Sequence, residues 1–278
     1  PQNMVSVEIE FNVPQLDTKS RTYVHSEFIA EEDRINWFHY YVYDSKGMLS
    51  GYGKCGSSAE TRVSMHLNSN AEYTMYAIAN GPEISPVPAT ENDILNSAYQ
   101  NESLGGLNSE VEDCPRLMMT AIAALEANDE GYKVRLDFRR MTARIGLSFD
   151  TSALNNDVSL EIKEVSVVNI PSQVYYFKEN APVEGLKCLS SACSVVPSGL
   201  DDKVVFYCYE NVQGELLPGN SSQMTKFFPE SSRYNELCTY ICVKGTYSSP
   251  RKRGEIIYRL YPGRDASDFS LERNSVYD

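Results

Sequence analysis

The histidines are the side chains best suited to catalysis or metal binding, and their spacing favours neither. His25, His39 and His66 are scattered and form no His-x-His or His-x-x-x-His pair of the kind that holds a metal. A serine or cysteine nucleophile would need one of them as its base, and no Gly-x-Ser-x-Gly elbow is present. No glycine-rich phosphate loop follows a predicted strand. We therefore expect no catalytic residue, no metal, no cofactor and no enzyme activity.

Acidic residues offer a second kind of chemistry, but no pair stands out. Glycoside hydrolysis needs only two carboxylates at a set separation, so a chain with 38 acidic residues does not exclude it. Asp265 and Asp268 could supply oxygen ligands to calcium, although the further Asp/Asn ladder and glycine of a dedicated loop are missing. The runs 31–33 and 201–202 are typical of solvated loops.

The chain has seven cysteines, an odd number, and none of them shows the C-x-x-C spacing of a zinc site. A Cys188–Cys193 disulfide, or one from Cys208 to a facing strand, is as compatible with the sequence as buried free thiols are. Cys238 and Cys242 would lie on one face of a strand but ~13 Å apart, too far to bridge.

The net charge of -13 argues against nucleic acid and anionic membrane surfaces as partners. The basic run Arg251-Lys252-Arg253 is typical of an exposed turn between strands. No apolar run approaches the ~20 residues of a membrane helix, and residues 1–20 lack the order of a signal peptide. Because the chain opens at Pro1 almost directly into a strand pattern, we expect that a targeting segment has been removed. Any lipid anchor would lie outside the given sequence.

Alternation of apolar and polar residues predicts β-strands along most of the chain. The segment 4–13 places Val5, Val7, Ile9, Phe11 and Val13 on one face. Segment 35–43 is apolar on both faces, which predicts a central strand. Residues 44–47 are predicted to form a turn after it. Segments 63–67 and 73–79 are predicted to pair as a hairpin.

Later segments are also β-rich. Residues 84–115 are expected to form a long surface excursion, and 117–125 fits a helix or a buried strand. Phase changes at 139–140 and between Ile162 and Val165 predict bulges or bends. We expect an all-β protein with two sandwich domains, 1–172 and 173–278, the second lacking its last strand.

The C-terminal third carries a set of motifs in a fixed order. They are Tyr207-x-x-Glu210-Asn211-x-x-Gly214, then 237–241, then 257–263 with Gly263, running into Asp268-Phe269 and Arg273-Asn274. In this order they resemble the fimbrillin-like and FimB-type anchor proteins of Bacteroidales fimbriae. The N-terminal half resembles them more loosely, through 42–47, 73–80, 140–145 and 165–170. Pro262 departs from the pattern, which has leucine before the glycine.

The resemblance implies two transthyretin-like β-sandwich domains in tandem and an exported lipoprotein displayed at the outer membrane as an anchor, shaft or tip subunit. Its partners would be other fimbrial subunits, with host or bacterial surface ligands as further candidates. Shaft relatives lose a first strand by cleavage after an arginine, and a neighbour's strand fills the groove by β-strand addition. Here the strand 4–13 would be the one exchanged and Arg21 the cleavage site. The alternation by itself favours an ordinary first strand.

A rival hypothesis from another class is a carbohydrate-binding β-sandwich at the outer-membrane surface. It is motivated by 19 tyrosines, whose rings would stack on sugars if they were exposed.

Overall fold

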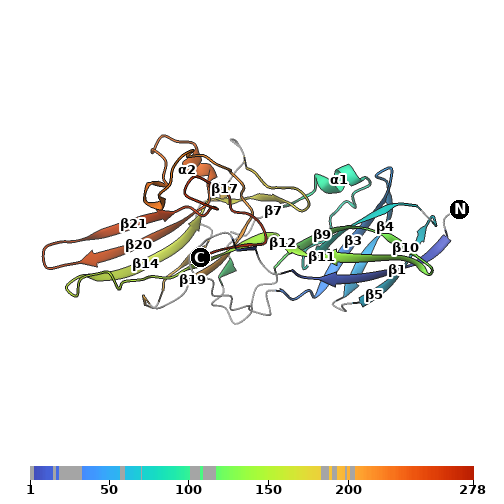
Figure 1. The fold of residues 1–278 in the computed structure, drawn as a ribbon, viewed down its shortest axis with the longest axis horizontal. Helices are drawn as coiled ribbons and strands as arrows, with labels where there is room; N and C mark the ends of the chain where they lie inside the picture. The colour runs from blue at the N-terminus through green and yellow to red at the C-terminus, as the bar shows by residue number, and fades with distance from the viewer. Residues whose placement is uncertain are drawn as a thin grey trace.

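Two β-sandwiches lie end to end in the elongated molecule (Figure 1). The structure is a computed structural model, and it describes residues 3–14, 17–18, 33–56, 60–69, 71–100, 107–108, 117–182, 188–189, 193–197, 199–200 and 204–278. Because the described elements are almost all strands, the predicted all-β class is confirmed.

The first sandwich packs the sheet β10-β11-β1-β5 against the sheet β12-β9-β6-β3-β4. Its core combines side chains from both sheets, including Val7, Ile9, Phe38, Met75 and Leu136, all fully buried. Its strands are β1 (Asn3–Asn12), β3 (Trp37–Asp44), β4 (Leu49–Gly56), β5 (Glu60–Leu67), β6 (Tyr73–Ala79), β9 (Met119–Ala124), β10 (Glu126–Asn128), β11 (Gly131–Asp137) and β12 (Arg139–Arg140).

β1 confirms the predicted first strand, and it lies inside its sheet. It pairs in parallel with β11 and antiparallel with β5. Gly131 opens β11 opposite Ser6 with φ +141°, where a Cβ would stand 2.2 Å from the Ser6 carbonyl oxygen. Only glycine lets the two backbones approach this closely at that φ.

A third layer covers the outer face of the β3–β6 pair. Tyr41, Tyr43 and Tyr76 point into it and meet Ile94 and Tyr176. This layer contains α1 (Glu91–Leu95) and the two-stranded sheet of β7 (Ala98–Gln100) and β16 (Gln173–Tyr175). The predicted central strand 35–43 is therefore confirmed, because β3 is covered on both faces.

The second sandwich packs the sheet β2-β22-β13-β19-β8 against β18-β14-β20-β21. Its strands are β2 (Asp17–Thr18), β8 (Leu107–Asn108), β13 (Thr142–Leu147), β14 (Ser159–Val168), β18 (Cys193–Val195), β19 (Val204–Tyr209), β20 (Tyr240–Ser248), β21 (Arg253–Leu260) and β22 (Ser275–Tyr277). A short pair, β15 (Ile170–Pro171) and β17 (Cys188–Leu189), lies beside it, and the loops carry η2 (Gln223–Thr225) and α2 (Tyr234–Leu237).

The chain passes from one sandwich to the other at Met141. Arg139 and Arg140 pair with β9 of the first sandwich, whereas Thr142 already pairs with β19 of the second. The phase change predicted as a bend at 139–140 is this crossing. The long strands thus change from the first sandwich to the second near residue 141, although the short strands β2 and β8 already pair within the second sandwich. Division into folding units 1–172 and 173–278 stays a prediction.

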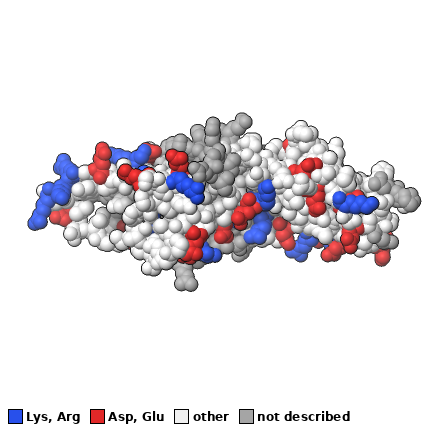
Figure 2. All heavy atoms as spheres, turned by 90° about the horizontal axis from the view of Figure 1, so that it is seen from above, with Lys and Arg blue, Asp and Glu red and all other residues white. Residues whose placement is uncertain are grey.

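Three further predictions can be compared with the strands. The predicted hairpin of 63–67 and 73–79 is wrong, because β5 pairs with β1 whereas β6 pairs with β3 and β9 in the opposite sheet. Segment 117–125 contains strand β9 (Met119–Ala124), and the bulge lies between Ile162 and Glu164 as predicted. The run 251–253 lies at the turn between β20 and β21 and is exposed, as expected (Figure 2).

The side chains of Cys55, Cys208, Cys238 and Cys242 are buried. Cys55 and Cys242 are free thiols, and Cys208 and Cys238 lie in the cores. Cys238 follows α2 and not a strand, so the predicted shared strand with Cys242 is wrong. Among the described residues no helix is long and apolar enough to cross a bilayer.

Candidate functional site

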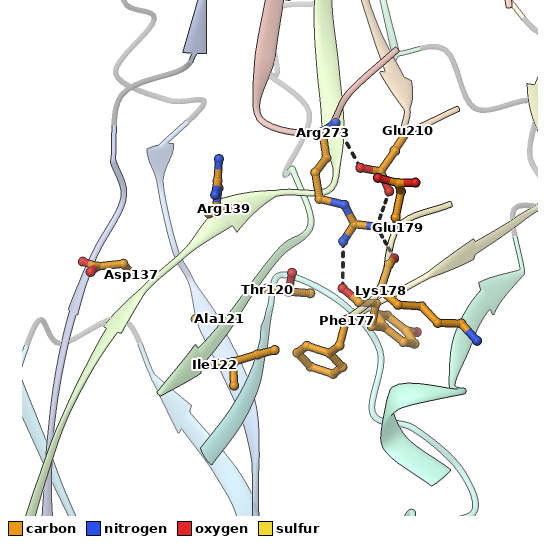
Figure 3. Close-up of a pocket in the computed structure, with 11 residues that line it drawn as sticks. Thr120, Ala121, Ile122, Asp137, Arg139, Phe177, Lys178, Glu179, Glu210 and Arg273 are labelled. Carbon is orange, nitrogen blue, oxygen red and sulfur yellow. Dashed lines mark hydrogen bonds and ion pairs between the residues drawn. The ribbon is translucent and has the colours of Figure 1, made fainter. Parts of the chain in front are cut away.

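Glu210 and Arg273 form a buried ion pair where the two sandwiches meet (Figure 3). The Arg273 Nη2 to Glu210 Oε2 distance is 2.7 Å, and the side chains are 16% and 6% exposed, respectively. Glu210 directly follows β19, and its backbone N–H donates to the carbonyl of Met141 at the crossing point. A charge pair this deeply buried is a demanding arrangement, since each ion needs hydrogen bonds to replace water.

Arg273 and Glu210 obtain those bonds from the segment after β16. The guanidinium donates to the carbonyl oxygens of Tyr175, Tyr176 and Lys178 at 3.0, 2.8 and 2.9 Å. The backbone N–H of Asn180 donates to Glu210 Oε2 at 2.8 Å. The pair therefore ties the C-terminal segment to the layer that covers the first sandwich.

Two motif asparagines fasten the same segment. Asn211 exchanges backbone hydrogen bonds with Leu271, and its amide donates to the Leu237 carbonyl and to Thr239. Asn274 has φ +56°, and its side-chain oxygen accepts from the backbone and the guanidinium of Arg140. Asparagine suits this left-handed conformation better than a branched residue would.

The remaining motif residues close the turn before β22. Phe269 donates its backbone N–H to Gly214, and Ser270 links Gly214 to the Asp268 carboxylate. At Gly263 φ is +155°, and a Cβ would lie 1.9 Å from the Asp268 carbonyl oxygen. The structure thus brings the motif residues of 210–214 and those of 263–274 together through hydrogen bonds and the ion pair. The bonds they make are internal to the chain, and a functional role for them stays a prediction.

A pocket of about 370 Å³ lies beside the ion pair. It is lined by residues of β9, by Asp137 and Arg139, and by 176–179 (Figure 3). No histidine, cysteine or serine lines it. Glu210 is engaged by Arg273, and the two other carboxylates, Asp137 and Glu179, stand on opposite sides in Figure 3.

Asp265 and Asp268, the carboxylates suggested as calcium ligands, accept hydrogen bonds within a turn. Asp265 Oδ1 accepts hydrogen bonds from the N–H and hydroxyl of Ser267 and from the N–H of Asp268, which lowers the pKa of Asp265. The Asp268 carboxylate accepts from Ser270 and from the N–H of Arg264. Within the described residues no cluster of metal-ligating side chains occurs.

The histidine His39 is buried inside β3, and burial lowers its pKa.

The predicted exchange strand faces the first core. Val7 and Ile9 are fully buried, and Val5, Phe11 and Val13 pack partly buried against the same cluster. Arg21 lies outside the described residues, so the cleavage prediction has no structural counterpart.

Lys226 is a buried cation that sequence reasoning missed. It is 3% exposed, its ammonium donates to the carbonyls of Pro262 and Asp265, and it lies over the Phe269 ring. Burial lowers its pKa to about 8, although Asp268 and Asp265 oppose the shift. The only feature of the sequence that could have indicated this buried cation is the single lysine within the stretch 224–228.

Lys226 gives the protein a measurable pH dependence. The folded-state pKa of about 8 lies below the ordinary 10.5, so between these pH values the unfolded chain binds more protons. Raising the pH from 7.5 to 9.5 should therefore stabilise the native protein relative to Lys226→Met by about 2 kcal/mol. Urea unfolding of both proteins at the two pH values measures the difference, and groups shared by both cancel. A difference independent of pH would contradict the assignment.

The comparisons with known proteins agree with this architecture. The family described as a domain of unknown function (DUF4906) matches residues 206–278, which carry the C-terminal motifs. None of the curated proteins compared with the chain matches it. A fimbrilin from Porphyromonas gingivalis superimposes with a TM-score of 0.55 over 98% of this chain and 88% of its own, at 14% identity. The chain has the fimbrillin fold. A candidate cell-adhesion protein from Bacteroides eggerthii shares this fold with a TM-score of 0.58, 14% identity, and coverage of 98% and 84% of the two chains, respectively.

The fimbrillin fold spans both sandwiches of this chain. The predicted resemblance is therefore confirmed at the level of the fold, and the tandem arrangement of two sandwiches with it.

Proposed function

We propose that the chain is a structural and adhesive subunit of a cell-surface fimbria, in an anchor, shaft or tip position. The observation that carries the proposal is the superposition of 98% of the chain on a fimbrilin. Partners are other fimbrial subunits. The subunit is an exported lipoprotein at the outer membrane, with no catalytic role. Host or bacterial surface ligands are its adhesion targets.

The place of β1 supports the proposal of assembly by β-strand addition. This strand pairs with β11 from Ser6 to Asn12 and with β5 from Asn3 to Glu10, and its inward side chains fill the centre of the core. Removing it would leave a long slot with hydrogen-bonding backbone on both sides and apolar pockets at alternate positions. Such a slot is what an incoming strand needs.

The carbohydrate-binding rival loses its motivation. Tyrosines that could stack on sugars lie largely in the cores, with Tyr41, Tyr43, Tyr132 and Tyr207 at most 2% exposed. Tyr52 and Tyr258 are the described tyrosines with large exposed fractions, and they belong to different sandwiches. The carbohydrate-binding hypothesis would be favoured if the protein bound saturably to sugars on a glycan array and were absent from purified appendages.

Appendages sheared from cells that express a tagged chain should contain the protein, and its mature N-terminus should carry lipid. Immunoblotting of purified appendages and mass spectrometry of the N-terminal peptide measure the two expectations separately. An unrelated tagged outer-membrane lipoprotein is the control for contamination. Presence in the membrane fraction with complete absence from appendages would contradict a fimbrial role.

A further inference from the structure

Two exposed turns at opposite ends of the molecule carry opposite charge. The turn between β20 and β21 holds Arg251, Lys252 and Arg253, which we name the basic turn. The two strands extend to the end of the second sandwich that lies farthest from the N-terminus (Figure 1). Lys and Arg side chains gather at this end of the molecule (Figure 2).

The basic turn is held in one conformation by hydrogen bonds and keeps its charges unpaired. Ser249 donates its backbone N–H to the Lys252 carbonyl at 2.8 Å, and the Lys252 N–H donates to the Ser249 hydroxyl at 3.1 Å. The three cationic side chains are exposed, and none of them forms an ion pair within the described residues. The turn therefore presents its positive charge to a partner.

The hairpin of β10 and β11 is the acidic counterpart. It carries Glu126, Asp129 and Glu130, all exposed, which we name the acidic turn. Gly131 opens β11 and pairs with Ser6 near the start of β1. The acidic turn thus lies at the end of the first sandwich where the N-terminus is marked (Figure 1).

Nearby cations leave most of this acidic charge unpaired. Arg62 pairs with Glu130 at 3.2 Å, whereas Lys133, which stands opposite Glu126, pairs with Glu10 at 2.7 Å. The two other carboxylates of the acidic turn form no ion pair in the part of the chain that the structure describes. Both turns therefore keep charge that a partner of opposite sign can use.

The two turns favour one arrangement of two copies of the chain. Each copy carries a net charge of -13, so copies placed side by side repel each other. In an end-to-end arrangement the basic turn of one copy meets the acidic turn of the next, while the acidic bodies stay farthest apart. Because each copy then still has one turn of each sign available, the contact can repeat along a row.

We propose that the basic turn of one copy docks against the acidic turn of a second copy of this chain. Guanidinium and ammonium groups donate hydrogen bonds to carboxylates across the contact. Exposed ion pairs contribute little individually, so the contact aligns the copies and speeds their encounter more than it holds them together. The inference rests on the proposed function, because such alignment serves an assembly of subunits, and it involves no exchange of a strand.

Zero-length cross-linking of the full 278-residue chain tests the contact. A carbodiimide joins an amine to a carboxylate that touches it, and Lys252 supplies the amine. We expect mass spectrometry of the linked peptides to find Lys252 joined to the acidic turn, and only two copies can form this link because the turns lie at opposite ends (Figure 1). Raising NaCl from about 10 mM to about 0.3 M should lower the yield by about tenfold, since salt shortens the range of the attraction.

Charge reversal tests whether the two turns recognise each other. One variant reverses the basic turn (Arg251→Glu, Lys252→Glu, Arg253→Glu), and the other reverses the acidic turn (Glu126→Lys, Asp129→Lys, Glu130→Lys). Each variant alone has two ends of the same sign, so it should lose the low-salt association that sedimentation velocity detects in the native chain. An equimolar mixture of the two variants should regain it, because every contact then joins opposite charges. Failure of the mixture to associate would overturn the pairing.

The matched control makes the same change of net charge outside both turns, at three exposed cations: Arg135→Glu, Lys163→Glu and Arg264→Glu. Association of this variant should stay within about twofold of that of the native chain, because the contact is untouched. An equal loss in this control and in the variant with the reversed basic turn would overturn the proposal. Thermal melts verify that each variant is folded.

The remaining outcomes separate the partner and the function. Retention on a sulfated polysaccharide that depends on the basic turn, in a chain that does not associate with itself, would replace the second copy by an acidic glycan and overturn the proposal. A protein that is present in appendages but shows no contact through these turns would overturn the inference and leave the fimbrial role standing. Association through the turns by a protein absent from appendages would support the contact and count against the fimbrial role.

Discussion

Arg273→Met should lower the free energy of unfolding by about 3–5 kcal/mol, the cost of leaving a buried charge without its partner. The variant removes the guanidinium that reaches Glu210 and the carbonyls of Tyr175, Tyr176 and Lys178. Glu210 would keep the N–H groups of Asn180 and residue 273 but lose its counter-charge. Urea denaturation followed by tyrosine fluorescence and circular dichroism measures the change.

The control for Arg273 is an exposed arginine with the same kind of partner. Arg62 is 61% exposed and pairs with Glu8 and Glu130 at 3.5 and 3.2 Å, so Arg62→Met should cost at most about 1 kcal/mol. The double variant Glu210→Gln with Arg273→Met should cost less than the sum of the single variants, since both break the same pair. If Arg273→Met cost no more than Arg62→Met, the junction would not depend on the ion pair.

Ile9→Ala should destabilise the protein by about 2–5 kcal/mol, because Ile9 is fully buried in the first core and a cavity would remain. The effect should appear in unfolding of the first sandwich, and hydrogen exchange of β1, β5 and β11 locates it. Since Val7 fills the next inward position, Val7→Ala should act in the same direction.

The matched control is a neighbour on the outward face of β1. Glu10 pairs with Lys133 at 2.7 Å, and the two side chains are 33% and 43% exposed, so Glu10→Gln should change stability by at most about 1 kcal/mol.

A chain shortened to begin at Pro14 should lose the cooperative transition of the first sandwich. Adding a peptide with the sequence of residues 3–12 should restore it, as strand exchange requires. Failure of that peptide to bind the shortened chain would contradict the exchange hypothesis for β1.

Exchange of β1 requires its release from the first sandwich, because the strand is present and its inward side chains are buried. Release would expose Val7 and Ile9, which are fully buried in the core.

The sequence by itself determined the all-β class, the faces of the strands and the motif set. Alternation is a local property, so the buried positions of β1 could be read from 4–13, and β3 from its two apolar faces. The ambiguity at 117–125 had the same local origin, because a short apolar run satisfies both periods. The order and spacing of 207–214 and 263–274 indicated the fimbrillin resemblance before any contact was known.

Only the tertiary structure decided which strands pair and which charges are buried. β5 and β6 follow each other along the chain, yet they lie in opposite sheets, because each finds its partner among distant strands. Likewise Glu210 and Arg273 meet across 63 residues, and Lys226 becomes buried through carbonyls 36 and 39 residues away. Pairing, burial and pKa depend on contacts between residues far apart in the chain, and the period of a single segment carries no information about them.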